Sequence, residues 1–140
     1  QERVGRVSYA SGPLLASTDA FAVVVDGKVT HGAYPHTGID PVPIAAEVIQ
    51  AFQTIRRRVI ATQPVVLTIG QIHGGTRNNI LAGQVRMEGT LRTLDEAVRE
   101  QVKSLMKQMA SGIAQANGTT ARIEWFDAGN PVTFNDPALV

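Results

Sequence analysis

Strand-type and helix-type segments follow one another along this chain in the order strand, helix, strand, strand, helix, strand. Apolar residues recur every three or four positions in the two helical segments and alternate with polar ones in the later strands. This order predicts an α+β, ferredoxin-like β-α-β-β-α-β sandwich, with one four-stranded antiparallel sheet and both helices on one face. Because many unrelated functions use that fold, the architecture alone assigns none.

The strands are predicted from β-branched composition, alternation and the turn residues that bound them. The predicted ranges are 20–27 (AFAVVVDG), 64–72 (PVVLTIGQI), 84–92 (QVRMEGTLR) and 120–126 (TARIEWF), with a glycine-rich loop over 73–79. In the third strand Val85, Met87 and Leu91 share one face, whereas Arg92 lies on the polar face. That polar face is expected to meet water or a polar neighbour.

Both helices have recognisable starts. Asp40 is a suitable N-cap with Pro41 at the first helical position, and an apolar stripe follows at Ile44, Val48, Phe52, Ile55 and Val59. The basic triplet 56–58 would suit the negative end of that helix dipole. Thr93 and Glu96 predict a capping box for the second helix. Its stripe is Val98, Val102, Leu105, Met109 and Ile113, and Asn117-Gly118 ends it.

The composition excludes several classes of function. The net charge of +1 gives no strong attraction for nucleic acid or an anionic membrane, and the polar face of the third strand has no aromatic side chain to stack a base. The absence of cysteine excludes disulfides, thiolate zinc sites and cysteine nucleophiles. No apolar run approaches the roughly 18 residues of a membrane span. We therefore expect neither a nucleic-acid nor a membrane partner.

The stretch HGAYPHTGIDP, residues 31–41, gathers potential metal ligands in His31, His36 and Asp40. The two histidines lie in a loop with glycine and proline rather than one helical turn apart, and Asp40 is needed as a helix cap. No second carboxylate is present nearby to act as a base. We predict no metal site within this chain, and local chemistry alone describes a histidine-rich loop.

Three longer stretches resemble the satellite domain, also called the lid or dimerisation domain, of the zinc-dependent aminoacylase, hippurate hydrolase and glutamate carboxypeptidase family. They are GPLLASTDAFAVVVDGKVTHGAYPHTGIDPV, VVLTIGQIHGGTRNNI and MEGTLRTLDEAVRE, in the family's order and spacing. The resemblance is closest to the branch that cleaves N-acyl amino acids. It implies a linker from a missing catalytic domain over 1–18, a dimerisation and lid domain over 19–128, and the return to the catalytic domain over 129–140. Both chain ends look like cuts in a longer chain.

The resemblance also implies what the parent protein does. A metal-dependent amidohydrolase or peptidase is expected, with two zinc ions or similar metals, their ligands and a glutamate base in the separate catalytic domain. This chain alone would bind no cofactor and hydrolyse nothing. We expect N-acyl amino acids or peptides as substrates and a cytoplasmic rather than exported parent. A stand-alone ferredoxin-like binding or regulatory module is the alternative.

Three residues acquire roles from the resemblance. His31 is expected to reach the partner subunit's active site and to donate a hydrogen bond to the oxyanion of the tetrahedral intermediate; the alternative is a turn histidine satisfied by backbone. Asn78 matches the start of the family's N-x-I-P motif, with Leu81 replacing the proline. Arg92 matches the arginine of G-T-x-R and would bind a substrate carboxylate, unless it pairs with Glu88 on the surface.

The resemblance also implies a homodimer that forms through the second predicted strand and the first helix. The second strand is an edge strand in the usual order of this fold, and its VVLTI run would be an aggregation hazard if left bare. Pairing with its twin across a two-fold axis would cover it.

Overall fold

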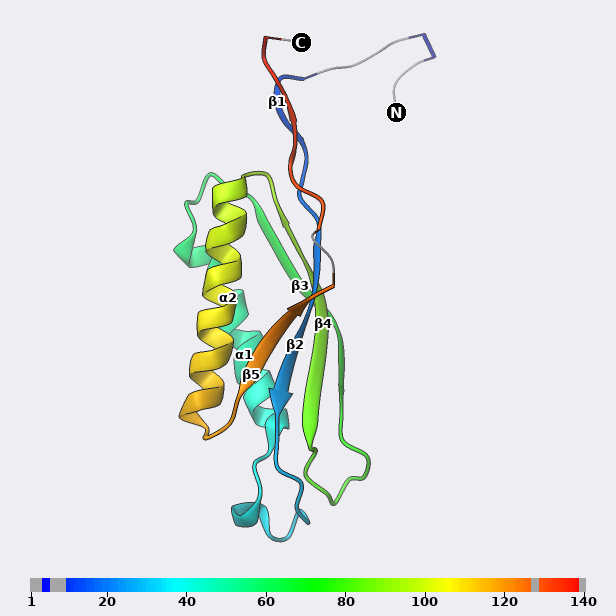
Figure 1. The fold of residues 1–140 in the computed structure, drawn as a ribbon, viewed down its shortest axis with the longest axis vertical. Helices are drawn as coiled ribbons and strands as arrows, with labels where there is room; N and C mark the ends of the chain where they lie inside the picture. Colours follow the sequence, from blue (N-terminus) through cyan, green and yellow to red (C-terminus); the bar gives the residue numbers. More distant parts are fainter. Residues whose placement is uncertain (1–3, 6–9, 127–128, 139–140) are drawn as a thin grey trace.

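A computed structural model describes residues 4–5, 10–126 and 129–138 of the chain. The predicted sandwich is confirmed: four antiparallel strands lie in the order β3-β4-β2-β5, and both helices cover one face of this sheet (Figure 1). The elements are β2 (Asp19–Asp26), α1 (Pro41–Gln53), β3 (Val65–Gly74), β4 (Gln84–Thr93), α2 (Glu96–Ala116) and β5 (Ala121–Trp125). Parts of the predicted segments 1–18 and 129–140, and the end of the predicted domain at 127–128, lie outside the described residues.

The apolar run of β2 is explained by its central place in the sheet. Phe21, Val23 and Val25 join the core beneath the helices, and Ala22 and Val24 on the opposite face are equally buried. An ion pair of 2.6 Å between Arg86 on β4 and Glu124 on β5 spans β2 on that face, because these strands flank β2. The strand is therefore buried on both sides although the helices cover only one.

The start of α2 differs from the predicted capping box. Asp95, not Thr93, is the N-cap, and its Oδ1 accepts the N–H of Val98 at 2.9 Å. The Thr93 hydroxyl is unavailable because it lies in the interior, where it meets the Ser17 hydroxyl at 3.0 Å. The buried line of α2 is also rotated from the predicted stripe: Met106, Ala110 and Ala114 are buried, whereas the predicted Leu105, Met109 and Ile113 are half-buried. These residues are the buried ones because α2 packs against both α1 and β5.

Two further boundaries differ from the prediction. The first helix ends at Gln53 and a separate 3-10 turn, η2 (Ile55–Arg58), carries the basic triplet. Strand β3 continues to Gly74, so the glycine-rich loop begins later.

No helix in the described residues is long and apolar enough to cross a membrane.

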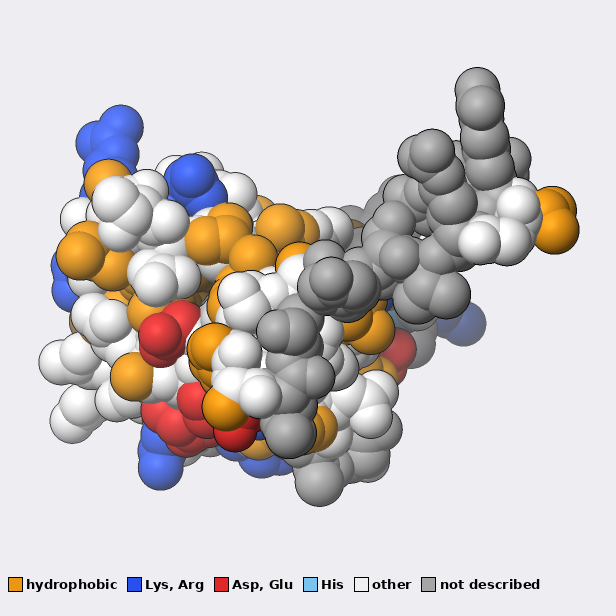
Figure 2. All heavy atoms as spheres, turned by 90° about the horizontal axis from the view of Figure 1, so that it is seen from above, with side chains coloured by type: hydrophobic (Ala, Val, Ile, Leu, Met, Phe, Trp, Pro, Cys, Tyr) orange, Lys and Arg blue, Asp and Glu red, His pale blue; other side chains and the backbone are white. Residues whose placement is uncertain are grey.

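Two short strands were not predicted from the sequence. Strands β1 (Gly12–Leu15) and β6 (Thr133–Asn135) pair antiparallel and project from the end of the sheet where β2 begins (Figure 1). We call this ribbon the arm. Viewed from that end, hydrophobic side chains lie open along the arm and its base (Figure 2), where the exposed large apolar residues include Leu14, Leu15, Phe126 and Phe134.

Three consecutive residues join the arm to the sandwich. The Ser17 N–H donates to the carbonyl of Thr93 at 2.8 Å, Thr18 and Asn130 exchange two backbone hydrogen bonds of 2.9 Å, and Asp19 forms an ion pair with Arg99. We call this place the junction. The buried polar side chains of the described residues are Ser17, Asp19, Thr93 and Arg99, all at the junction. Burying polar groups is tolerated where each finds a partner, as here.

Candidate functional site

Two loops close the end of the sheet opposite the arm (Figure 1): residues 27–40 between β2 and α1, and residues 75–83 between β3 and β4. We call these two loops the tip. An isolated bridge pairs His31 with Ile80, and the N–H of Gly32 donates to the carbonyl of Asn79 at 2.8 Å. The backbone thus fastens the two loops together into one unit.

His31 is exposed on this tip, and one of its ring nitrogens is engaged. The backbone N–H of Ala33 donates to Nδ1 of His31 at 3.1 Å. A nitrogen that accepts a hydrogen bond carries no proton, so the neutral ring is assigned a proton on Nε2. Nε2 of this exposed side chain has no hydrogen-bond partner in the described part of the chain, which leaves its proton available to a ligand.

Asn78 lies at the same tip as His31. It lines an open hollow of about 260 Å³ together with Gly32 and Asp40. Asp40 is the predicted cap of α1, and its Oδ1 accepts the N–H of Val42 at 3.0 Å. The structure therefore brings together two of the three predicted site residues, His31 and Asn78. Among the residues described, no group of three or more acids and histidines could hold a metal ion.

Arg92 lies at the far end of β4, beside the arm. It is exposed on the open face of the sheet, as its alternation predicted, and lines a hollow of about 570 Å³ with Thr18, Asn130 and Thr133. Glu88, the alternative partner of Arg92, instead binds Arg86 at 2.8 Å. Arg92 lies eight residues from Gln84 at the tip end of β4, which corresponds to about 26 Å at 3.3 Å per residue.

The open face between these two ends carries a chain of ion pairs that sequence reasoning missed. Asp26, Arg122, Glu124, Arg86 and Glu88 follow one another at distances of 2.6 to 3.2 Å. The hydrogen bond to Glu124, with a second to Glu88, raises the pKa of Arg86, and the bond from Arg86 lowers the pKa of Glu124. Alternation placed these charges on one face, but their pairing depends on the register between strands.

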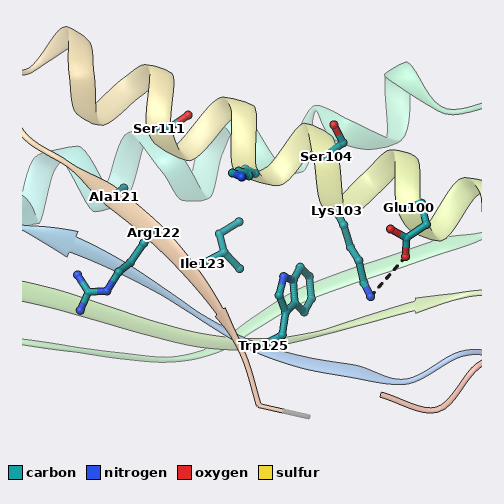
Figure 3. A pocket seen from close by; sticks show the side chains of 9 residues that line it. Glu100, Lys103, Ser104, Ser111, Ala121, Arg122, Ile123 and Trp125 are labelled. Atoms are coloured by element: carbon teal, nitrogen blue, oxygen red, sulfur yellow. Dashed lines mark ion pairs between the residues drawn. The ribbon is translucent and has the colours of Figure 1, made fainter. Parts of the chain in front are cut away.

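Another hollow, of about 700 Å³, lies between α2 and β5 (Figure 3). Its Lys103 is already engaged, since Nζ lies 3.0 Å from Asp19, 3.7 Å from Glu100 and 4.8 Å above the Trp125 ring. Its Arg122 binds Asp26 at 3.2 Å. These cations are committed to internal partners, and the hollow includes none of the predicted site residues.

Comparison with known proteins finds a family model and similar sequences that cover most of this chain. Residues 18–118 match the sequence model of a family described as the peptidase dimerisation domain. The chain is 40% identical over 136 residues to thermostable carboxypeptidase 2 of Saccharolobus solfataricus, covering 96% of this chain and 35% of that protein. It is 41% identical over 137 residues to N-acetyl-L-cysteine deacetylase of Bacillus subtilis, covering 97% and 33%.

A solved structure agrees with these matches. A Bacillus subtilis protein described as a dinuclear metal-binding peptidase from the M20 family superposes with a TM-score of 0.71 and 32% identity, covering 92% of this chain and 30% of that one. The chain thus spans about a third of the length of the curated relatives it matches.

Proposed function

This chain belongs to the peptidase dimerisation domain family, and on that premise we propose that it is the dimerisation and lid domain of a metal-dependent amidohydrolase. Its substrates are N-acyl amino acids or related peptides. Deacetylases and carboxypeptidases among the relatives support this activity, and a relative described as binding two metal ions supports a dinuclear centre, zinc or a similar ion, in a separate catalytic domain. When bound there, the metal would polarise the amide carbonyl and activate water.

His31 donates a hydrogen bond from Nε2 to the oxyanion that forms on the amide carbon. Its fixed Nδ1 acceptor bond supports this role, because the proton must then be on Nε2. The tip lies at the end of the sheet away from the arm, and both chain ends lie on the arm side (Figure 1). His31 therefore points away from its own catalytic domain and serves the active site of a partner subunit.

Arg92, in contrast to His31, serves the active site of its own subunit. Beside the arm it lies near its own catalytic domain, and its planar guanidinium suits two-pronged binding of a substrate carboxylate. Arg92 and the tip of one protomer lie too far apart to meet in one site, given the length of β4 between them. Each active site therefore takes His31 and Asn78 from one protomer and Arg92 from the other, so the dimer is required for activity.

The dimer forms through β3 and α1. Strand β3 is an edge of the sheet, as predicted, and exposes the apolar side chains Val66 and Ile72. An unpaired ten-residue edge of this kind favours pairing with a second chain. Antiparallel pairing of two β3 strands across a two-fold axis would give one continuous sheet of eight strands.

The exposed place of His31 at the tip carries the proposal, and mixing two inactive variants of the metal-loaded full-length parent tests it. We expect His31→Ala and Arg92→Ala homodimers each to lose on the order of a hundredfold in kcat/KM. After subunit exchange, a mixed dimer would contain one intact site, so an equal mixture should recover about a quarter of wild-type activity.

The matched control mixes His31→Ala with Asn78→Ala. Because both residues come from the same protomer, no site of that mixed dimer is intact and no activity returns. Recovery in this control, or its absence in the first mixture, would contradict the assignment. The activity of Asn79→Ala is measured beside that of Asn78→Ala. If only Asn79→Ala loses activity, the substrate-binding role belongs to Asn79 rather than Asn78.

A further inference from the structure

Tyr34 is a large aromatic residue that stays 59% exposed on an otherwise tightly bonded loop. Its N–H donates to the carbonyl of His31 at 2.8 Å. Its own carbonyl accepts the N–H of Thr37 at 3.0 Å and the Thr37 hydroxyl at 2.8 Å. The backbone that presents the ring is therefore held in place at three points.

Two histidine rings contact the Tyr34 ring at its sides. The ring centroids of His31 and Tyr34 lie 6.1 Å apart at 61°, and those of Tyr34 and His36 lie 6.3 Å apart at 68°. These distances and angles are typical of edge-to-face aromatic contacts. A ring restrained by two aromatic neighbours loses little conformational entropy when it binds a ligand, which favours exposed aromatics of this kind as binding residues.

The outward surface of Tyr34 has no internal partner. Its phenol oxygen makes no hydrogen bond to any residue that the structure describes. The rings of Tyr34 and His31 are both exposed and lie in edge contact, with their centroids 6.1 Å apart. A ligand at His31 would therefore meet both an N–H donor and an aromatic surface.

We propose that Tyr34 is a specificity-determining residue that contacts an aromatic group next to the scissile amide of the substrate. The inference rests on the proposed function, because it requires His31 to enter the partner's active site. If Nε2 donates to an oxyanion about 3 Å away, the groups attached to the same carbon lie within reach of a ring centred 6.1 Å from the imidazole. Aromatic groups gain most from an offset or edge contact with that ring.

The test uses the metal-loaded full-length parent with four substrates, the N-acetyl and N-benzoyl derivatives of alanine and of phenylalanine. If the aromatic group that Tyr34 contacts is the acyl group, we expect Tyr34→Ala to lower kcat/KM for the benzoyl substrates by about three- to tenfold relative to the acetyl ones. If it is the amino-acid side chain, the same fall is expected for the phenylalanine substrates relative to the alanine ones. Tyr34→Phe should keep the preference, since it retains the ring. Val29→Ala, an exposed apolar residue of the same tip, is the matched control and should leave all ratios unchanged.

Unchanged ratios in Tyr34→Ala, or an equal fall for all four substrates, would overturn the inference. His31→Ala separates this result from failure of the proposed function. If His31→Ala lowers activity on every substrate while Tyr34→Ala leaves the ratios alone, the inference about Tyr34 fails and the proposed function stands. If His31→Ala has no effect, the proposed function fails and the role of Tyr34 fails with it.

Discussion

Asp19 and Arg99 face each other at the junction as a two-pronged ion pair. Arg99 donates from Nε to Oδ2 at 2.8 Å and from Nη2 to Oδ1 at 2.6 Å, and their side chains are only 2% and 7% exposed. Lys103 adds a second cation 3.0 Å from Oδ1. Such pairs tie distant segments in one geometry, since a buried charge without its partner is costly. This pair ties the first residue of β2 to the second turn of α2.

Asp19→Asn should lower the free energy of unfolding of this chain by about 3 kcal/mol, because it removes the buried counter-charge of Arg99 and leaves the half-exposed Glu96, 2.6 Å from Nη1, as an acidic partner. Urea unfolding at neutral pH measures the change. Asp26→Asn is the matched control, because Asp26 binds Arg122 in a pair that is 40% and 52% exposed. An exposed pair contributes about 0 to 1 kcal/mol, so equal losses in the two variants would refute the role of burial.

The same carboxylate should make the stability depend on acid pH. Burial raises the pKa of Asp19, but the hydrogen bonds and charges of Arg99 and Lys103 outweigh it, and the net pKa lies below the ordinary value. A lowered folded-state pKa gives stability that is present above the unfolded pKa and is lost as the pH falls through the folded pKa. The wild type should therefore lose more unfolding free energy than Asp19→Asn between about pH 5 and pH 2. Parallel pH curves would contradict this.

Gly129→Ala should destabilise the junction. Gly129 has a φ of +67°, and an added Cβ would lie 2.5 Å from Oδ1 of Asp19 and 2.8 Å from Nη2 of Arg99. Gly118→Ala is a close control, because Gly118 has a φ of +74° with nothing within 4 Å of the added atom. Both variants carry the backbone strain of about 1 kcal/mol, and only Gly129→Ala adds the clash. Equal melting temperatures for the two variants would show that the contact is unimportant.

Ile72→Lys should weaken the proposed dimer at the β3 edge. Ile72 is 52% exposed on that strand, so a lysine there costs the monomer little while it blocks edge pairing. We expect at least about a tenfold rise in the dimer dissociation constant, roughly 1.4 kcal/mol, by sedimentation equilibrium. Ser104→Lys lies on α2 beside the opposite edge of the sheet and should leave the dimer intact. If Ser104→Lys dissociates the dimer and Ile72→Lys does not, the interface lies on the β5 side.

The sheet and its helices were predictable because their signals are local. Alternation in β4 and the Asp40 cap depend on neighbours in the sequence, and both are found where they were predicted. The cap of α2 was mispredicted because Thr93 has a distant partner in Ser17, which no local pattern reveals. The arm was missed for the same reason, since β1 and β6 are short, mostly exposed strands that pair across the whole chain.

The residues of the candidate site remain predictions, and the structure adds where in the fold they lie. The motif resemblance singled out His31, Asn78 and Arg92, and only the structure places the length of β4 between Arg92 and the tip that holds the other two. The state of His31 depends on a backbone N–H two residues away, and the exposure of Tyr34 depends on the loop conformation. Neither can be derived from composition or spacing.

The central place of β2 has a consequence for synthesis. It is the first strand of the sheet to leave the ribosome, yet its neighbours β4 and β5 begin at Gln84 and Ala121. At about 5 to 20 residues per second, several seconds pass before either edge of this apolar strand can be paired. During that interval the nascent chain exposes a segment that binds other strands readily. The strand order therefore predicts how long the nascent chain is exposed to misassociation, independently of how stable the finished domain is.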